Sequence, residues 1–160
     1  MSAPAGYRVA VTALGHAYRG DDAIGILVAE ALRELLPQDV PVFIDRGDAL
    51  AMLDHWSDRE AVVCVDACAP LGEPGRVHRL DLSVDTLPPA GAGTSSHALG
   101  LAEAVALSRA LRLTPRKLIV YAIEGRCFEP GAEPTPEVAA TVRSVARAVA
   151  REVACLRQTI

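Results

Sequence analysis

The sequence predicts an α/β fold: one three-layer domain with a mostly parallel twisted sheet of about five strands, one antiparallel edge strand and helices on both faces. Short β-rich runs alternate with segments of helical apolar spacing in the order β-α-β-α-β-β-α-β-α. The run Ala61–Val65 is continuously apolar, which is typical of a strand covered on both faces. The linker from Asp66 to Gly75 is too short for a helical crossover of about a dozen residues, so the strand Arg76–Leu82 is expected to be antiparallel and near an edge.

The composition fits one domain, residues 1–160, with an aliphatic core. Hydrophobic residues make up 51% of the chain and aromatic residues only 4%. The net charge of -4 argues against a nucleic-acid-binding protein, whose affinity comes mainly from neutralising phosphates. No apolar run approaches the ~20 residues of a membrane helix, and the first residues do not resemble a secretory signal, so we expect a cytoplasmic protein.

The pattern of cysteines and the absence of several motifs argue against some classes of site. The four cysteines are spread along the chain without a C-x-x-C pair, which is neither a disulfide framework nor a zinc ribbon. Cys64 lies inside the apolar run AVVCVDA and is expected to be a small buried hydrophobe. The chain also lacks a G-x-S-x-G elbow, a G-x-x-x-x-G-K-[ST] loop, an H-E-x-x-H pair and a G-x-G-x-x-G turn. We therefore expect neither a nucleotide cofactor nor serine-type hydrolysis.

The N-terminal half of the chain supplies two strands and two helices. The first strand, Tyr7–Ala13, is followed by a Gly-containing turn and by a helix that begins at Ala23, has one apolar face and is stopped by Pro37. The second strand is the β-rich segment Val40–Ile44, and Leu50–Trp56 is compatible with a short second helix.

The C-terminal half begins with a Pro/Gly/Ser loop, Thr86–Ser96, which leads to His97 just before a helix. Lys117–Ile123 is predicted to be the last central strand. A second Gly/Pro loop, Gly125–Thr135, leaves the carboxyl end of that strand. The final helix is expected to open at Pro136, since proline favours the first position of a helix.

Two adjacent acids, Asp21 and Asp22, stand between the first strand and the first helix. In open α/β sheets this position, outside the carboxyl ends of the strands, is where ligands bind. Neighbouring carboxylates attract protons or cations, which indicates metal or proton chemistry. The structural alternative is that one of them caps the helix, and one carboxylate is enough for that. We expect Asp21 to be the cap and Asp22 to be the freer group.

Three groups of metal-ligand type are brought together by the predicted topology: Asp22 after the first strand, Asp66 after the third and His97 at a loop-helix junction. Two carboxylates and an imidazole suit zinc, nickel or iron, and three protein ligands leave positions open for water or substrate. Each residue alone is equally compatible with a structural role, so the hypothesis depends on all three lying on one rim of the sheet. His55 and His78 lack such partners in the sequence and are interpreted as packed or half-exposed residues.

Four segments carry a resemblance to a known family. They are the acidic pair in RGDDAIG (Arg19–Gly25), the strand-closing acid in VVCVDA (Val62–Ala67), the block SSHALGLAEAVAL (Ser95–Leu107) and the loop with Glu-Pro-Gly and Thr-Pro (Glu129–Pro136). With these segments in the family's order and spacing over nearly the whole chain, the sequence resembles the hydrogenase maturation endopeptidases. The Ser-His dipeptide followed by Gly-Leu is the most specific feature. Members of that family are small cytoplasmic α/β proteases that trim the C-terminal tail from the large-subunit precursor of nickel-iron hydrogenases.

The resemblance implies a hydrolase of the aspartyl-type endopeptidase family whose partner is a hydrogenase large-subunit precursor. It also implies that Asp22, Asp66 and His97 are metal ligands that recognise nickel already inserted in the precursor. The nickel would then arrive with the substrate, and a different divalent metal such as zinc is a candidate ligand when the protein is alone. The sequence shows no obvious nucleophile, and a metal-polarised carbonyl or a metal-bound water is the simplest mechanism. We expect a monomer that binds neither nucleic acid nor membrane.

Two turns depart from the family pattern. Gly15-His16 stands where the family usually has Gly-Asn, and the segment Asp45–Asp48 (DRGD) stands where it usually has Asp-Gly-Gly-Thr. The aspartate and the second glycine match, so the turn is expected to be retained. His16 is either a fourth ligand or, as we favour, a solvent-facing loop residue. The candidate substrate-loop residues are His16, Asp45, Gly47 and Asp48.

Two other functions remain open from the sequence. One is a non-catalytic relative that binds the nickel-loaded precursor as a checkpoint, which the changes at His16 and Asp48 make plausible. The other is a phosphoacceptor signalling domain, which also has an acidic pair after its first strand and an Asp after its third. Against it, the acids here follow Ala13 only after a loop of several residues, and the last strand ends in Ile123–Gly125 where such domains place a lysine.

Overall fold

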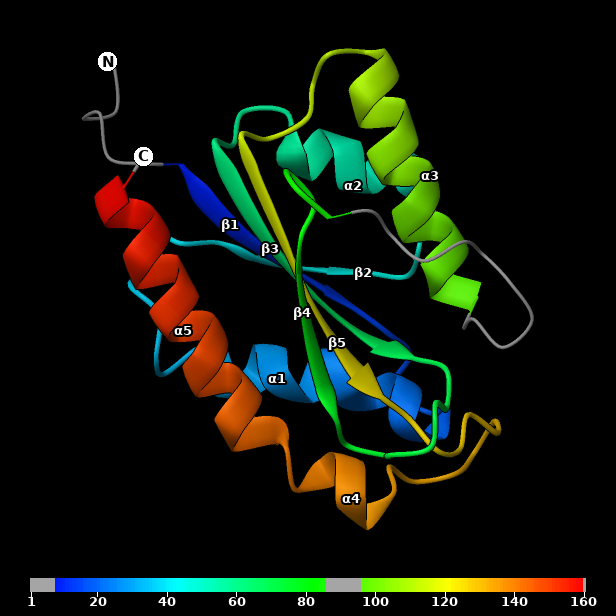
Figure 1. Ribbon diagram of the computed structural model, residues 1–160. Helices are drawn as coiled ribbons and strands as arrows, with labels where there is room; N and C mark the ends of the chain where they lie inside the picture. Colours follow the sequence, from blue (N-terminus) through cyan, green and yellow to red (C-terminus); the bar gives the residue numbers. More distant parts are fainter. Residues whose placement is uncertain (1–7, 86–95, 160) are drawn as a thin grey trace.

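The computed structural model describes residues 8–85 and 96–159, which form a five-stranded sheet with helices on both faces (Figure 1). The strand order is β2-β1-β3-β5-β4, and every neighbouring pair is parallel except β4 with β5. The strands are β1 (Val9–Leu14), β2 (Val42–Asp45), β3 (Ala61–Cys68), β4 (Val77–Asp81) and β5 (Lys117–Glu124). The helical segments are the 3-10 turn η1 (Gly20–Ala23) and the helices α1 (Ile24–Leu32), α2 (Ala49–Trp56), α3 (Ser96–Ala110), α4 (Pro136–Ala139) and α5 (Val142–Thr159).

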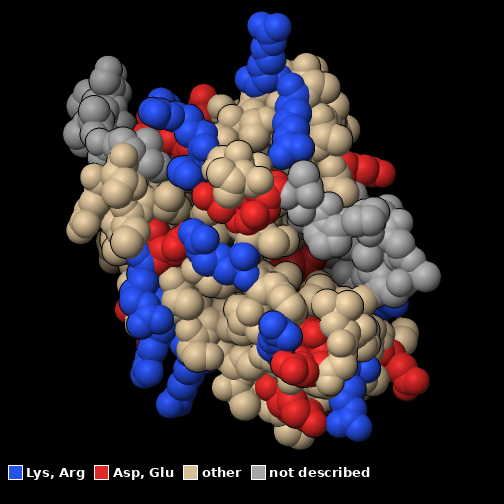
Figure 2. All heavy atoms as spheres, viewed as in Figure 1, with Lys and Arg blue, Asp and Glu red and all other residues tan. Residues whose placement is uncertain are grey.

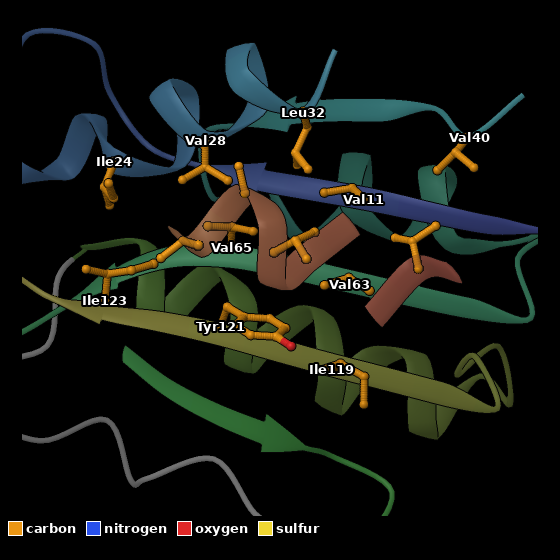
Figure 3. Packing of buried hydrophobic residues seen from close by; sticks show 14 of the residues in the cluster. Val11, Ile24, Val28, Leu32, Val40, Val63, Val65, Ile119, Tyr121 and Ile123 are labelled. Carbon is orange, nitrogen blue, oxygen red and sulfur yellow. The ribbon is translucent and has the colours of Figure 1, made fainter. Parts of the chain in front are cut away.

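Two aliphatic cores hold the sheet in place. Helices α1 and α5 cover one face, and α2 and α3 cover the other. The central strand β3 contributes to both cores, because Val63 and Val65 belong to the first and Val62 and Cys64 to the second. Figure 3 shows Val63 and Val65 in the first core, which also contains Val28 of α1. Each fully buried Val or Leu contributes about 1.5–3 kcal/mol, so the ends of β3 are firmly positioned.

The predicted fold class is confirmed, including the antiparallel edge strand. β4 pairs with β5 in the antiparallel sense, as the short linker after β3 requires. Some boundaries differ: α1 begins at Ile24 rather than at Ala23, because the preceding residues form the 3-10 turn η1. The predicted loop Thr86–Ser96 lies outside the described residues except for Ser96, which opens α3. In the described part of the chain no helix is long and apolar enough to cross a membrane.

The prediction of one continuous final helix is wrong, because the segment is divided into α4 and α5. Pro136 opens α4 as expected. At the break, the hydroxyl group of Thr141 donates to the carbonyl oxygen of Val138 at 2.7 Å, and such side-chain bonds compete with the helical backbone bonds. Basic side chains line the left side of the molecule in Figure 2, where Figure 1 places α5. The exposed arginines of α5 at helical spacing are Arg143, Arg147 and Arg151.

Candidate active site

Two acids stand in one row across the carboxyl ends of β2, β1 and β3. Asp45 pairs in register with Leu14, and Ala13 pairs with Val65, so Asp66 follows in the row of Leu14. Neighbouring strands are about 4.8 Å apart, which separates the backbones of Asp45 and Asp66 by roughly 10 Å. Both acids are buried, with exposed fractions of 5% and 4%. Because side chains alternate between the faces of a sheet, both point to the side of the α2 and α3 core, to which Leu14 belongs.

Asp22 lies in η1, which is held closely against the end of β1. The N–H of His16 donates to the carbonyl oxygen of Asp22 at 3.3 Å. Gly15 is required here, because a Cβ at that position would overlap the same oxygen. η1 also contacts β3, the strand that carries Asp66, and the exposed fraction of Asp22 is only 3%. Asp22 and Asp66 are therefore buried carboxylates on neighbouring elements at one edge of the sheet.

Asp21 does not cap a helix, so that prediction is wrong: neither η1 nor α1 has a side-chain cap. Its buried carboxylate accepts the backbone N–H groups of Arg126, Cys127 and Thr135 at 2.7, 3.0 and 2.6 Å, and the hydroxyl group of Thr135 at 2.9 Å. Burial alone would raise the pKa of Asp21, but these hydrogen bonds outweigh it and lower the pKa. Asp21 is thus the anchor that joins η1 to the segment 125–135. Sequence patterns did not reveal this role, because the partners are more than a hundred residues away in the chain.

His97 lies in the first turn of α3 rather than before the helix, and its side chain is outside the described part of the structure. The position of this turn is fixed by Gly100, three residues later. A Cβ on Gly100 would overlap the carbonyl oxygen of Gly47 in the turn after β2. This close backbone approach brings the beginning of α3 to the same edge of the sheet as Asp45.

The structure therefore brings the elements that carry Asp22, Asp66 and His97 to one edge of the sheet. Among the described side chains, no three His, Cys, Asp or Glu residues are grouped so that they could hold a metal ion. The trio includes the undescribed side chain of His97, so its ligand geometry stays a prediction. The Oδ1 atom of Asp66 accepts the N–H of Ala67 at 2.8 Å, which orients that carboxylate. Two buried carboxylates and one imidazole are a donor set that fits nickel or zinc.

A carboxylate-imidazole pair stands beside this edge, and sequence patterns did not reveal it. Nδ1 of His55 lies 3.2 Å from Oδ2 of Asp45. Burial raises the pKa of Asp45, although the hydrogen bond and charge of His55 act in the opposite direction. The imidazole also stacks on the ring of Phe43, with 4.0 Å between ring centroids and 5° between planes. His55 is half-buried, as expected, but it faces an acid that the sequence places ten positions earlier.

The other candidate substrate-loop residues have identifiable structural surroundings. Asp48 caps α2, because its carboxylate accepts the N–H groups of Leu50 at 3.0 Å and Ala51 at 3.3 Å. Gly47 has a φ of 90°, in the left-handed region that favours glycine, so the turn after β2 depends on it. His16 is partly exposed in the loop after β1. Their contact with a substrate stays a prediction.

A second histidine, His78, also lies near a buried acid. His78 is half-exposed, as predicted, and its Nε2 atom lies 3.7 Å from Oε1 of the buried Glu124 on the neighbouring strand. Glu124 also accepts the N–H of Glu73.

Cys64 is fully buried, as predicted, and burial raises the pKa of its thiol. A buried thiol of this kind behaves as a small hydrophobe and not as a nucleophile.

Comparison with known proteins agrees with this architecture. The model of the hydrogenase maturation protease family, HycI, matches residues 26–152. Hydrogenase 2 maturation protease of Escherichia coli K12 is 29% identical over 140 residues, which cover 84% of this chain and 84% of the relative. The structure of the hydrogenase maturating endopeptidase HybD from E. coli is 26% identical, with a TM-score of 0.72 over 95% of this chain and 93% of its own. The nickel-iron hydrogenase maturation protease HybD from Thermococcus kodakarensis, 24% identical over 90% of this chain and 97% of its own, has the same fold with a TM-score of 0.72.

The fold and these relatives define the class of protein as an α/β endopeptidase. Since the family model spans well over half of its residues, the chain belongs to the hydrogenase maturation protease family. The resemblance found in the sequence is thereby confirmed. Asp66 and His97 lie inside the matched range, and Asp22 lies just before it.

Proposed function

We propose that the protein is a nickel-directed endopeptidase that removes the C-terminal tail of a nickel-iron hydrogenase large-subunit precursor once nickel is in place. It acts as a monomer in the cytoplasm. The observation that carries the proposal is the pair of buried carboxylates, Asp22 and Asp66, at the edge where the α3 turn with His97 begins. Relatives named as hydrogenase maturation proteases support the substrate class.

In this proposal nickel belongs to the substrate. Asp22, Asp66 and His97 supply at most three ligands, and a site with three protein ligands keeps coordination positions open. Such a site favours a metal ion that brings its remaining ligands from the precursor, and it binds a metal-free precursor less well. When bound there, nickel supplies a Lewis acid that polarises the scissile carbonyl group.

The chain's own residues prepare this edge for binding. The Ala67 N–H orients the carboxylate of Asp66. The hydrogen bonds of Asp21 tie η1, which also contains Asp22, to the segment 125–135. Because both proposed carboxylate ligands are buried, their charges act at an effective dielectric constant well below that of water. A cation is therefore attracted more strongly than it would be at an exposed acidic cluster.

The non-catalytic alternative is weakened by the structure around Asp48. The family pattern usually has Thr where this chain has Asp48, and both residue types cap helices. Because Asp48 does cap α2, the change preserves a structural role and need not signal lost activity. The phosphoacceptor alternative is disfavoured by the family match and by Glu124, a buried acid at the end of β5 where such domains have a lysine.

The experiment is a processing assay on a purified co-encoded precursor, with and without verified nickel loading. Mass spectrometry should show loss of the C-terminal tail only from the nickel-loaded form. Asp22→Asn and His97→Ala should abolish tail removal while the unfolding midpoint stays close to that of wild type. Asp58→Asn, at an exposed aspartate after α2, is the matched control and should process normally. Tight binding of the nickel-loaded precursor without tail removal would instead establish the non-catalytic checkpoint.

A further inference from the structure

The pair formed by Asp45 and His55 lies outside the proposed metal ligands and needs its own explanation. Asp45 ends β2 and is buried, with an exposed fraction of 5%. A buried carboxylate is costly unless it is hydrogen-bonded or paired with a cation. His55, in the last turn of α2, meets this need with Nδ1 at 3.2 Å from Oδ2 of Asp45.

The imidazole is held in one orientation by its neighbours. Its ring is parallel to that of Phe43 within 5° and 4.0 Å away. The next residue, Trp56, is almost fully buried, and its Nε1–H donates to Oγ1 of Thr12 in β1 at 3.2 Å. This bond fixes the end of α2 against the sheet. His55 is therefore preorganised to hold the carboxylate of Asp45, as supporting residues of functional groups must be.

The pair is directed toward the proposed site. Asp45 and Asp66 flank Leu14 in one row of the sheet and share its face. Burial is the largest cause that raises the pKa of the Cys64 thiol, and the charges of Asp66 and Asp45 raise it further. Both carboxylates therefore act on one buried atom of β3. The beginning of α3 packs on the turn that follows Asp45. Asp45 therefore shares one row of the sheet with Asp66 and precedes the turn on which the beginning of α3 packs.

We infer that His55 is a positioning residue that holds Asp45 as the proton-transferring carboxylate of peptide hydrolysis. This inference rests on the proposed function, which requires a base for water and an acid for the leaving amine. Water adds its oxygen to the scissile carbonyl carbon and gives one proton to Asp45. The C–N bond then breaks with its electron pair on nitrogen, and Asp45 passes the proton to that nitrogen. The new carboxyl group loses its remaining proton to the amine, so a carboxylate and an ammonium group result.

The charged surroundings of the pair determine its pH dependence. Asp48, in the turn after β2, raises the pKa of Asp45, and His55 lowers it. The guanidinium group of Arg59 lies 5.9 Å from the centroid of the Phe43 ring, on which His55 stacks. Asp54 on α2, and Glu103 and Arg109 on the described part of α3, are exposed. Removal of the imidazole should therefore raise the pKa of Asp45 and move the acid side of the activity profile to higher pH.

The test measures kcat and KM for the nickel-loaded precursor across a range of pH. Asp45→Asn should lower kcat by roughly 100-fold, the usual contribution of a general base, and His55→Phe by about tenfold. KM should stay within about twofold for both, since the proposed metal ligands are intact. The acid side of the His55→Phe profile should move to higher pH, and His55→Gln, which keeps a hydrogen-bond donor, should recover most of the rate. His78→Phe is the matched control, because this half-exposed histidine also faces a buried acid, and it should match wild type.

The double variant separates positioning from general stabilisation. If His55 acts through Asp45, His55→Phe should have no further effect on kcat in the Asp45→Asn background. A wild-type rate and pH profile for His55→Phe, or an additional loss of about tenfold in the double variant, would overturn the inference. If His55→Phe fails to fold, the pH profile of His55→Gln decides. If the wild-type protein removes the tail but the variants do not behave as expected, the inference fails and the proposed function stands. If the wild-type protein does not remove the tail, the proposed function itself is refuted.

Discussion

Asp21→Asn removes the charge of the carboxylate that joins η1 to the segment 125–135. One carboxylate oxygen accepts the N–H groups of Arg126 and Cys127, and the other accepts the N–H and the hydroxyl group of Thr135. Whichever way an asparagine amide is turned, its NH₂ group replaces one of these acceptors. At least one backbone N–H then loses its partner next to a buried side chain.

The expected loss of stability follows from these contacts. A buried donor without a partner costs about 1–3 kcal/mol, and the remaining hydrogen bonds weaken because they are no longer charge-assisted. We expect a total loss of about 2–5 kcal/mol, against roughly 5–15 kcal/mol for a whole domain. Asp21→Asn should therefore fold at 25 °C but unfold at a clearly lower urea concentration than wild type.

The pH dependence gives this prediction a definite sign. Because the folded state lowers the pKa of Asp21, the stabilisation is fully present above the pKa of an unfolded aspartate and is lost as pH falls through the lower, folded pKa. Urea unfolding at neutral pH should show the full difference between wild type and Asp21→Asn, and the difference should shrink in acid. The exposed Asp58→Asn is the control. Equal urea midpoints for Asp21→Asn and Asp58→Asn at neutral pH would refute the anchoring role.

Three further predictions concern the same edge and the core. Gly100→Ala should destabilise the protein by about 1–3 kcal/mol, because a Cβ overlaps the carbonyl oxygen of Gly47, although alanine normally favours helices. Thermal unfolding should show a lower Tm, and a raised Tm would contradict the close approach. Asp48→Ala should cost about 1 kcal/mol through loss of the α2 cap, whereas Asp48→Thr should recover most of it in the same measurement; equal Tm values would exclude a cap. A thiol reagent should label the exposed Cys155 rapidly and Cys64 only on unfolding, since Cys64 is buried and burial raises the pKa of its thiol. Mass spectrometry would detect the labels, and fast labelling of Cys64 in the native protein would contradict its place in the core.

The parts of the fold that the sequence predicted are those that local patterns determine. The continuous apolar run Ala61–Val65 identified the strand buried on both faces, and the short linker after Asp66 identified the antiparallel edge. The division of the last helix was missed because hydrophobic spacing does not register side-chain hydrogen bonds such as the one that Thr141 donates at the break. Strand topology also explains why an acid at the end of β2 and another at the end of β3 share one edge.

The site was predicted less completely, because hydrogen bonds between distant segments leave no spacing signal. Adjacent acids suggested a cap, but the Asp21 carboxylate found four donors on a loop more than a hundred residues later, which no local rule favours. His55 was interpreted as a packed or half-exposed residue without a partner, because its acid, Asp45, belongs to a different element. A strand-ending acid followed by a helix that carries a histidine in its last turn is the signal that could have identified this pair.

The central claim is that Asp22, Asp66 and His97 bind one metal ion, and histidine side-chain NMR tests it most directly. The chain has only four histidines, so their ring ¹⁵N signals can be assigned by substitution. Titration with Zn²⁺, a diamagnetic substitute for nickel, should shift a ring nitrogen of His97 and leave His55 and His78 unchanged, and Asp66→Asn should weaken the response by about 10-fold or more in Zn²⁺ concentration. An unchanged His97 signal at saturating Zn²⁺, or an equal response in Asp66→Asn, would contradict the account.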